Sequence, residues 1–375
     1  MTAAAAAAAA GPRLAVLDAL RGLSVLAMIH QHVGIWLWRG PDPGMDRFDY
    51  PGLVLLNTMV VMGAPMFFAL SGTGTAMLTR RARPGLDAML VRRGAMLWGY
   101  GLLVNLLTPS WFSWGSFFAL HLMGVAIATA PLWRRLSDTA ILLAAAAVLA
   151  ATPLVQAWLQ LPPELTNPEM RDTSQPGGAL RLMLAASQYS LLPWLSTYLV
   201  GFWAGRMIAA GRLRALVVVG AVLVAIAGVG HLAVQLGLGA PDSVLWRGFR
   251  LKVGWFPAPI AIVMGLLGPT LWVVAAAVRR EATAPLRSDH PLAELGRVSL
   301  TIFIVHAPLF RELSRPLGIW SALGPFATMA WVVGFTVVCL LAAHAWARVD
   351  FRFGAEWWLR RVADRAPVRS RRDSS

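Results

Sequence analysis

Ten apolar segments of about 20 residues recur along the chain, separated by short connections, many of them rich in arginine. A helix needs about this length to cross the hydrocarbon core, where its backbone must satisfy its own hydrogen bonds. The sequence therefore predicts an all-α fold: a polytopic integral membrane helical bundle with about 10 transmembrane helices. The expected spans are 14–38, 52–78, 87–108, 114–133, 139–160, 187–210, 213–236, 253–277, 295–312 and 323–347.

Composition agrees with a bilayer as the main partner. Hydrophobic residues make up 57% of the chain and charged residues only 14%, against about 25% charged in soluble domains. The net charge of +15 comes from arginines between apolar segments, not from a basic face with interleaved aromatic residues. A membrane is thus expected, and no nucleic acid.

The arginines alternate from one connection to the next, which predicts the orientation. Cytoplasmic connections are enriched in Lys and Arg, and this pattern places both termini in the cytoplasm of a multi-pass plasma-membrane protein. The inner segments carry Arg13, Arg80, Arg81, Arg83, Arg92, Arg93, Arg134, Arg135, Arg206, Arg212, Arg214, Arg279, Arg280, Arg287 and Arg297. The outer segments hold acids, among them Asp42, Asp46, Asp49, Glu164, Glu169 and Asp172.

Three regions follow from this reading. Residues 1–12 are expected to be a disordered cytoplasmic N-terminal tail without a cleaved signal peptide, 13–350 a transmembrane domain, and 351–375 a basic cytoplasmic tail. The outer loop 161–186 predicts either a lid that contacts substrate or a plain solvated loop. Tryptophans near span ends predict an interfacial belt: Trp36, Trp38, Trp111, Trp114, Trp357 and Trp358.

The first span holds the densest set of polar side chains. Asp18 and Arg21 are three residues apart and can form an ion pair on one helical face. His32 lies eleven residues beyond Arg21, which returns it to within about 20° of that face, roughly 16 Å along the axis. His30 points to the opposite face. Charged groups in hydrocarbon are costly, so such a stripe indicates function or a structural lock.

Both readings of the stripe stay open on spacing alone. A neutral imidazole at His32 can take a proton from a hydroxyl or amine, or attack an acyl group, and Arg21 can stabilise negative charge. Alternatively, the Asp18–Arg21 pair locks the bundle and His32 reaches the outer interface.

Further candidates lie in other spans. His121 and His306 are candidate substrate-binding residues with Asn57, although each alone is commonly an interior hydrogen-bonded group. Arg92 and Arg93 are candidates for binding cofactor phosphates with Ser71, or simply flank a span. Asn105 and Gln188 predict a cavity lining or helix bridging. Cys339 is the only cysteine and is expected to be buried, and no cluster has zinc spacing.

Six motifs follow one another in an order that resembles a known family. They are LDALRGLSVLAM from Leu17 followed by Gln31-His32, GAPMFFALSGTGTAML from Gly63, VRRGAMLWGYGLLVNLL from Val91, LPWLSTYLVGFWAGR from Leu192, LGRVSLTIFIVHAPLF from Leu295 and FGAEWWLR from Phe353.

Together these motifs resemble bacterial heparan-α-glucosaminide N-acetyltransferase-like proteins of the transmembrane acyltransferase superfamily. The Arg21–His32 spacing also fits the type 3 acyltransferases, which O-acylate glycans. The resemblance implies transfer of an acyl group, usually acetyl, from cytoplasmic acetyl-CoA or another acyl-CoA to a glycan or lipid-linked acceptor at the far side, with no metal. It implies His32 as the catalytic histidine, with Arg21 and Asp18 in support.

The chain departs from the lysosomal members, which carry a catalytic histidine in the loop between the first two spans. Here the loop from Arg39 to Pro51 has none, so either His32 does this work or the histidine chemistry is lost. The competing function is a transporter or flippase without covalent chemistry, although no inverted repeat is evident. A structural or sensory role is a third reading, and a homo-oligomer stays open.

Overall fold

The computed structural model describes residues 14–80, 84–251 and 256–364, with only the backbone described for 56–60. Within these ranges the chain is helical, apart from loops and one isolated parallel bridge between Trp38 and Leu323. The long helices are α2 (Ala15–Leu37), α4 (Gly63–Thr79), α5 (Leu86–Leu107), α8 (Asp138–Trp158), α10 (Leu191–Ala209), α11 (Leu213–Gln235), α13 (Ile260–Thr283) and α16 (Pro325–Ala347).

Shorter helices complete the bundle. They are α3 (Pro51–Val60), α6 (Ala119–Ala128), α7 (Ala130–Trp133), α9 (Gly178–Arg181), α12 (Val244–Phe249), α14 (Pro291–Arg297), α15 (Ser299–Ala307) and α17 (Ala355–Ala363). Single turns of 3₁₀ or π geometry occur at η1 (Arg47–Asp49), η2 (Glu169–Arg171), η3 (Leu182–Ala186) and η4 (Pro308–Leu313).

The helices match the predicted spans in order but not always in form. The second predicted span is divided between α3 and α4, and the fourth between α6 and α7. The ninth is α14 followed by α15 and η4, with a bend of 72° between them. The eighth, expected at 253–277, begins in residues outside the description, and its helix α13 covers Ile260–Thr283.

Among the described residues, four helices are long and apolar enough to cross a membrane by length and composition, namely α8, α11, α13 and α16. The bent pair of α14 with α15 and η4 would make a fifth. The all-helical membrane class is thus confirmed, whereas the count of ten crossings stays a prediction. Helices α2 and α5 are long enough but carry charged groups, including Asp18, Arg21, Arg92 and Arg93.

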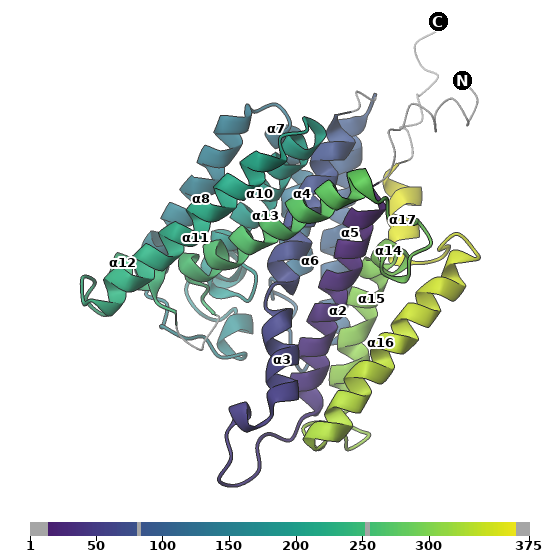
Figure 1. The fold of residues 1–375 in the computed structure, drawn as a ribbon. Coiled ribbons are helices and arrows are strands. Elements are labelled where there is room, and N and C mark those ends of the chain that lie inside the picture. The colour runs from purple at the N-terminus through teal and green to yellow at the C-terminus, as the bar shows by residue number, and fades with distance from the viewer. Residues whose placement is uncertain (1–13, 81–83, 252–255, 365–375) are drawn as a thin grey trace, which may run out of the picture.

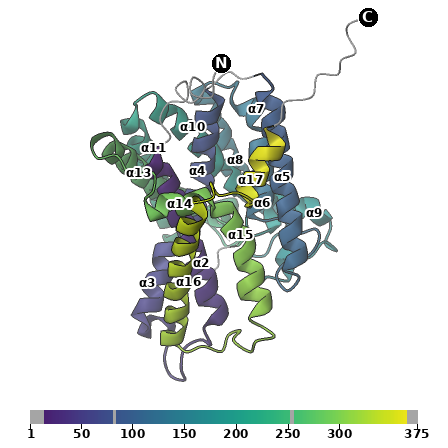
Figure 2. The ribbon, with the colours of Figure 1, turned by 90° about the vertical axis from the view of Figure 1, so that its right-hand side faces the viewer.

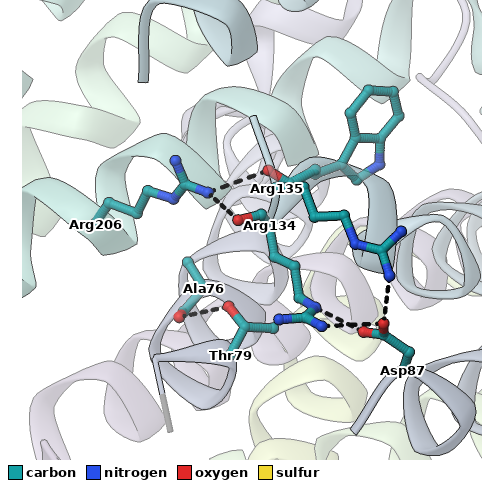
Figure 3. A network of polar contacts seen from close by, with 7 residues as sticks. Ala76, Thr79, Asp87, Arg134, Arg135 and Arg206 are labelled. Atoms are coloured by element: carbon teal, nitrogen blue, oxygen red, sulfur yellow. Dashed lines mark hydrogen bonds and ion pairs between the residues drawn. The ribbon is translucent and has the colours of Figure 1, made fainter. Parts of the chain in front are cut away.

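One end of the bundle brings together connections that are far apart in sequence (Figure 1). It is here called the arginine end, because Arg134, Arg135 and Arg206 meet there. Asp87 at the start of α5 accepts hydrogen bonds from Arg134 Nε (2.6 Å) and Arg135 Nη2 (2.9 Å), as Figure 3 shows. Arg206 of α10 donates to the backbone carbonyls of Trp133 and Arg134. The loop end lies opposite and carries residues 38–50 and 314–324 (Figure 1).

Glycines let two helix pairs approach closely. A Cβ on Gly201 of α10 would lie 2.1 Å from the carbonyl oxygen of Ala69 in α4, and one on Gly72 would lie 2.1 Å from that of Tyr198. A Cβ on Gly296 of α14 would lie 1.8 Å from the carbonyl oxygen of Asp18 in α2. Small residues at such crossings are a common way for membrane helices to pack.

Part of the segment 351–375, expected to be a tail, is packed. Helix α17 contacts α5 and α15 (Figure 2), and the Glu356 carboxylate accepts hydrogen bonds from the backbone N–H groups of Leu300 (2.5 Å) and Thr301 (3.2 Å) at the start of α15. Burial raises the pKa of Glu356 above its usual value, and the hydrogen bonds from Thr301 and Leu300 oppose this. The predicted tails at 1–12 and 365–375 lie outside the described residues.

The loop expected at 161–186 is folded onto the bundle. It contains η2, α9 and η3, and Met170 is buried. The backbone N–H of Leu165 donates to Phe256 O (2.7 Å), and the Ser113 hydroxyl donates to Arg171 O (2.7 Å).

Candidate functional site

Two histidines from distant parts of the chain meet between α2 and α15. His32 Nδ1 lies 2.9 Å from His306 Nε2. His306 is almost fully buried, and its Nδ1 lies 2.6 Å from the backbone oxygen of Phe303, one turn earlier in α15. The sequence named both histidines but did not predict their contact.

These contacts fix where the hydrogens lie when both rings are neutral. A carbonyl oxygen can only accept, so His306 Nδ1 carries a hydrogen and donates it to Phe303 O. His306 Nε2 then has only a lone pair, and His32 Nδ1 donates to it. Nε2 of His32 is left with its lone pair, which is the state needed for a general base or a nucleophile.

Aromatic rings hold the His32 imidazole in place. Trp36, one turn further along α2, stacks on it with ring centroids 4.8 Å apart, and Trp111 contacts it edge-on at 5.1 Å. The interfacial-belt interpretation is wrong for Trp36, which is buried and packs in the interior. Trp111 likewise faces the histidine.

His32 lies where two adjoining cavities meet. The smaller has a volume of about 30 Å³, room for little more than a water molecule, and is mostly apolar. The larger has a volume of about 280 Å³ and a more polar wall. Both are lined by Met28, His32, Ala64, Trp111, Gln188 and Tyr189.

The two cavities differ in their remaining walls. His306 and Phe303 line the smaller one, together with Ser24 and Val25. Arg311 and Asn167 line the larger one. Asn167 belongs to the segment 161–186, so that segment reaches the larger cavity. Its contact with substrate stays a prediction.

Asp18 and Arg21 form the expected pair but lie away from the histidines. Arg21 Nη1 donates to Asp18 Oδ1 (3.3 Å), and Arg21 Nη2 donates to the backbone oxygen of Leu70 in α4 (3.3 Å). Neither side chain lines either cavity. His32 lies eleven positions beyond Arg21 along the helix, roughly 16 Å. The structure therefore does not bring this pair to the imidazole.

The candidate cofactor residues lie away from His32, with Arg92 and Arg93 in the first turns of α5 and Ser71 in the middle of α4. Arg92 Nε and Nη2 donate to Ala363 O (3.0 and 2.8 Å), and Arg93 forms an ion pair with Asp364 (2.8 Å), so both contact α17 and the residue after it. Ser71 of α4 accepts a hydrogen bond from Thr75 at its backbone oxygen and lines neither cavity.

The remaining histidines lie outside the cavities. His30 Nε2 contacts Thr336 Oγ1 of α16 (2.6 Å), which confirms that it faces away from the His32 side. His121 is buried, accepts a hydrogen bond from the backbone N–H of Phe118 (3.3 Å), and packs against Gly101 of α5. The side chain of Asn57 lies outside the described residues.

Several wall residues were missed or only half identified from sequence. Gln188 was named as a cavity or bridging residue, and it lines both cavities, whereas Asn105 donates to the backbone oxygens of Trp114 and Ser116. Arg311 was not singled out, although a charge inside the predicted span 295–312 is itself a signal of function. Within the described ranges, no three His, Cys, Asp or Glu side chains are grouped to hold a metal ion.

Comparison with known families matches two regions of the chain. The family model described as heparan-alpha-glucosaminide N-acetyltransferase, catalytic, matches residues 13–233, and one described as a protein of unknown function (DUF418) matches 208–366. His32 lies in the first region and His306 in the second. No curated protein matches the chain. Because residues 13–233 are more than half of the 375, the protein belongs to the heparan-alpha-glucosaminide N-acetyltransferase catalytic family.

Proposed function

We propose that this protein is a membrane-embedded acetyltransferase that moves an acetyl group from acetyl-CoA to an amine or hydroxyl of a glycan or lipid-linked acceptor. The observation that carries this proposal is the His32–His306 hydrogen bond at the junction of the two cavities. Membership of an N-acetyltransferase family supports the reaction class.

In the direct route, the nitrogen of the acceptor amine attacks the thioester carbonyl carbon. At the same time His32 Nε2 takes a proton from that amine. A C–N bond forms and the C–S bond breaks. The thiolate of CoA then takes the proton from the His32 imidazolium. During this step His306 Nε2 continues to accept from His32 Nδ1, which keeps the ring oriented.

A two-step route uses the same nitrogen. His32 Nε2 attacks the thioester itself, releases the CoA thiolate and carries the acetyl group as an acetyl-imidazolium that keeps its Nδ1 hydrogen. The acceptor amine then attacks this acetyl group, the C–N bond to the ring breaks, and the ring leaves in its neutral form. The proton that the amine loses goes to the CoA thiolate. Rapid acid quench with labelled acetyl-CoA and no acceptor separates the routes, because only the second leaves label on the protein.

The proposal includes ten spans, with the arginine end in the cytoplasm. Acetyl-CoA would then approach from the arginine end and the acceptor from the loop end, where the larger cavity meets Trp36 and Asn167. Arg21, Arg92 and Arg93 lie on the donor side in this arrangement, and binding of phosphates by Arg92 or Arg93 would compete with their contacts to Ala363 and Asp364.

The test replaces His32 and compares it with a histidine on the other face of α2. His32→Ala should lower the rate of acetyl transfer from radiolabelled acetyl-CoA by about 10²–10⁴, the usual contribution of a positioned general base. His30→Ala is the control, because His30 contacts Thr336 and lines neither cavity.

Transfer rates in purified full-length protein, together with thermal unfolding of each variant, complete the measurement. Unchanged turnover in folded His32→Ala would reject the catalytic role. A wild-type protein that moves no label at all would favour the transporter or flippase reading.

A further inference from the structure

One wall of the larger cavity carries a guanidinium with an unused nitrogen. Arg311 lines this cavity with His32. Its Nε donates to Ser110 Oγ (3.1 Å) and its Nη2 to Ser110 O (3.2 Å). Its Nη1 has no hydrogen-bond partner in the part of the chain that the structure describes.

Three tryptophan rings, and a hydrogen bond made by the next residue, hold this guanidinium in position. The Arg311 Cζ lies 5.6 Å from the ring centroid of Trp36 and 5.1 Å from those of Trp111 and Trp320. Glu312, the next residue, accepts a hydrogen bond from the backbone N–H of Ser110 (3.0 Å). The head group is therefore oriented before any ligand arrives.

The surroundings of Arg311 are positively charged. Arg171 and Arg315 are close enough to interact electrostatically with it, as is the carboxylate of Glu312. Arg171 donates to the backbone oxygen of Pro109 (3.0 Å). Two other guanidinium groups and one carboxylate thus lie within electrostatic range of Arg311, at the end of the bundle where the sequence predicts few arginines.

Nearby acids of the segment 161–186 are occupied by their own loop. The Glu169 carboxylate accepts from the hydroxyl and backbone N–H of Thr166, and that of Asp172 accepts from those of Ser174. These hydrogen bonds hold the pKa of Glu169 and of Asp172 below the usual range, so both are ionised at neutral pH. The arginine that interacts electrostatically with both acids is Arg181 of the same loop, and among the described residues no ion pair is found between either acid and Arg311 or Arg171.

A guanidinium with a free N–H in a partly closed aromatic cavity is well suited to bind a phosphate or carboxylate oxygen. We infer that Arg311 binds an anionic group, a phosphate or a carboxylate, on the same acceptor molecule that His32 deprotonates. This inference rests on the proposed acetyltransferase function and adds the charge class of its acceptor.

The test compares three amino sugars that share the same 2-amine. Glucosamine is neutral outside that amine, glucosamine 6-phosphate adds a phosphate, and muramic acid adds a carboxylate. The wild-type kcat/KM should be about tenfold to a hundredfold higher for at least one of the two anionic sugars, the range expected for one charged hydrogen bond. Which of the two is preferred identifies the anion.

Arg311→Gln should reduce this preference to near unity and leave the KM for acetyl-CoA unchanged. Arg47→Gln is the matched control, because Arg47 is an exposed arginine of η1 at the loop end and does not line either cavity. It should keep the wild-type preference.

Two results would overturn the inference. One is equal kcat/KM for all three sugars in the wild type, and the other is a preference that survives in Arg311→Gln. The wild-type comparison needs no variant, so the inference remains testable if Arg311→Gln does not fold. Calorimetry without acetyl-CoA measures the affinity of the wild type and of Arg311→Gln for glucosamine 6-phosphate and for glucosamine, and so separates the anion site from catalysis. A preference for the phosphate that depends on Arg311 supports the site even if no acetyl transfer is detected.

Discussion

Among single residues, His32 differs from the other six histidines in the cavities that it lines and in its hydrogen bond to His306, rather than in how deeply it is buried. His121 is at least as buried, yet it lies outside both cavities. His32 lines both, and its Nδ1 is linked through His306 to a backbone carbonyl. That link leaves the Nε2 lone pair of His32 available to act as a base or a nucleophile.

This chain of contacts makes His306 a positioning residue. His306→Phe keeps a flat ring but removes the acceptor for His32 Nδ1, which costs one hydrogen bond of about 1 kcal/mol and should lower kcat about fivefold to tenfold. His306→Gln offers an amide oxygen in its place and should recover part of the rate.

Steady-state kcat and KM of both variants, beside thermal unfolding, test this role. Equal loss of kcat in the Phe and Gln variants would show that His306 only fills space.

Sequence alone could predict some of the contacts made by α2, although not those within the site. Helical spacing placed Asp18 and Arg21 in a pair and turned His30 away from His32, and both expectations are confirmed. The His32–His306 contact joins residues 274 positions apart, and spacing within one helix carries no information about such pairs. Arg311 and Trp36 were missed for a different reason. Arg311 is the last but one residue of the predicted span 295–312 and Trp36 lies near the end of 14–38, and at a span end a charge or an aromatic ring has a simpler interfacial explanation.

At the scale of elements, the site depends on how closely α2 and α4 can approach their neighbours. Gly201→Ala in α10 would place a methyl group 2.1 Å from the Ala69 carbonyl oxygen of α4. Such overpacking should destabilise the protein by about 1–3 kcal/mol. Gly334→Ala in α16 is the control, because a Cβ there meets nothing within 4 Å.

Thermal unfolding of both variants in the same detergent gives the comparison. A Gly201→Ala protein as stable as Gly334→Ala would mean that the α4–α10 crossing is looser than the structure has it.

The elements themselves were predicted better than their breaks. Apolar length identified α8, α11 and α16 closely, because each is a long apolar run with few charges, and α8 continues through Pro153. The break after α3, the short α6 and the 72° bend before α15 were not predicted. These breaks and bends lie around the cavities. Polar side chains replace part of the apolar surface there, so the hydropathy of the sequence is a poorer guide to the helices.

At the scale of the whole molecule, the two ends of the bundle have different chemistry. Ion pairs such as Arg134–Asp87 and Arg206–Asp138 tie connections together at the arginine end. The larger cavity, with Arg311 and Asn167, is lined by elements that reach the loop end. His32 lies six residues from the loop-end terminus of α2, counting Leu37 as the first. This asymmetry suits a donor and an acceptor that arrive from opposite sides.

Acetyl transfer across a sealed vesicle tests whether the donor and the acceptor reach His32 from opposite sides of the membrane. Full-length protein is reconstituted with glucosamine trapped inside, a cleavable C-terminal tag reports its orientation, and labelled acetyl-CoA is added outside. In molecules whose arginine end faces outward, labelled N-acetylglucosamine should accumulate inside the vesicle and should be absent with His32→Ala. Product that forms only with donor and acceptor on the same side, or that forms equally with His32→Ala, would contradict this account.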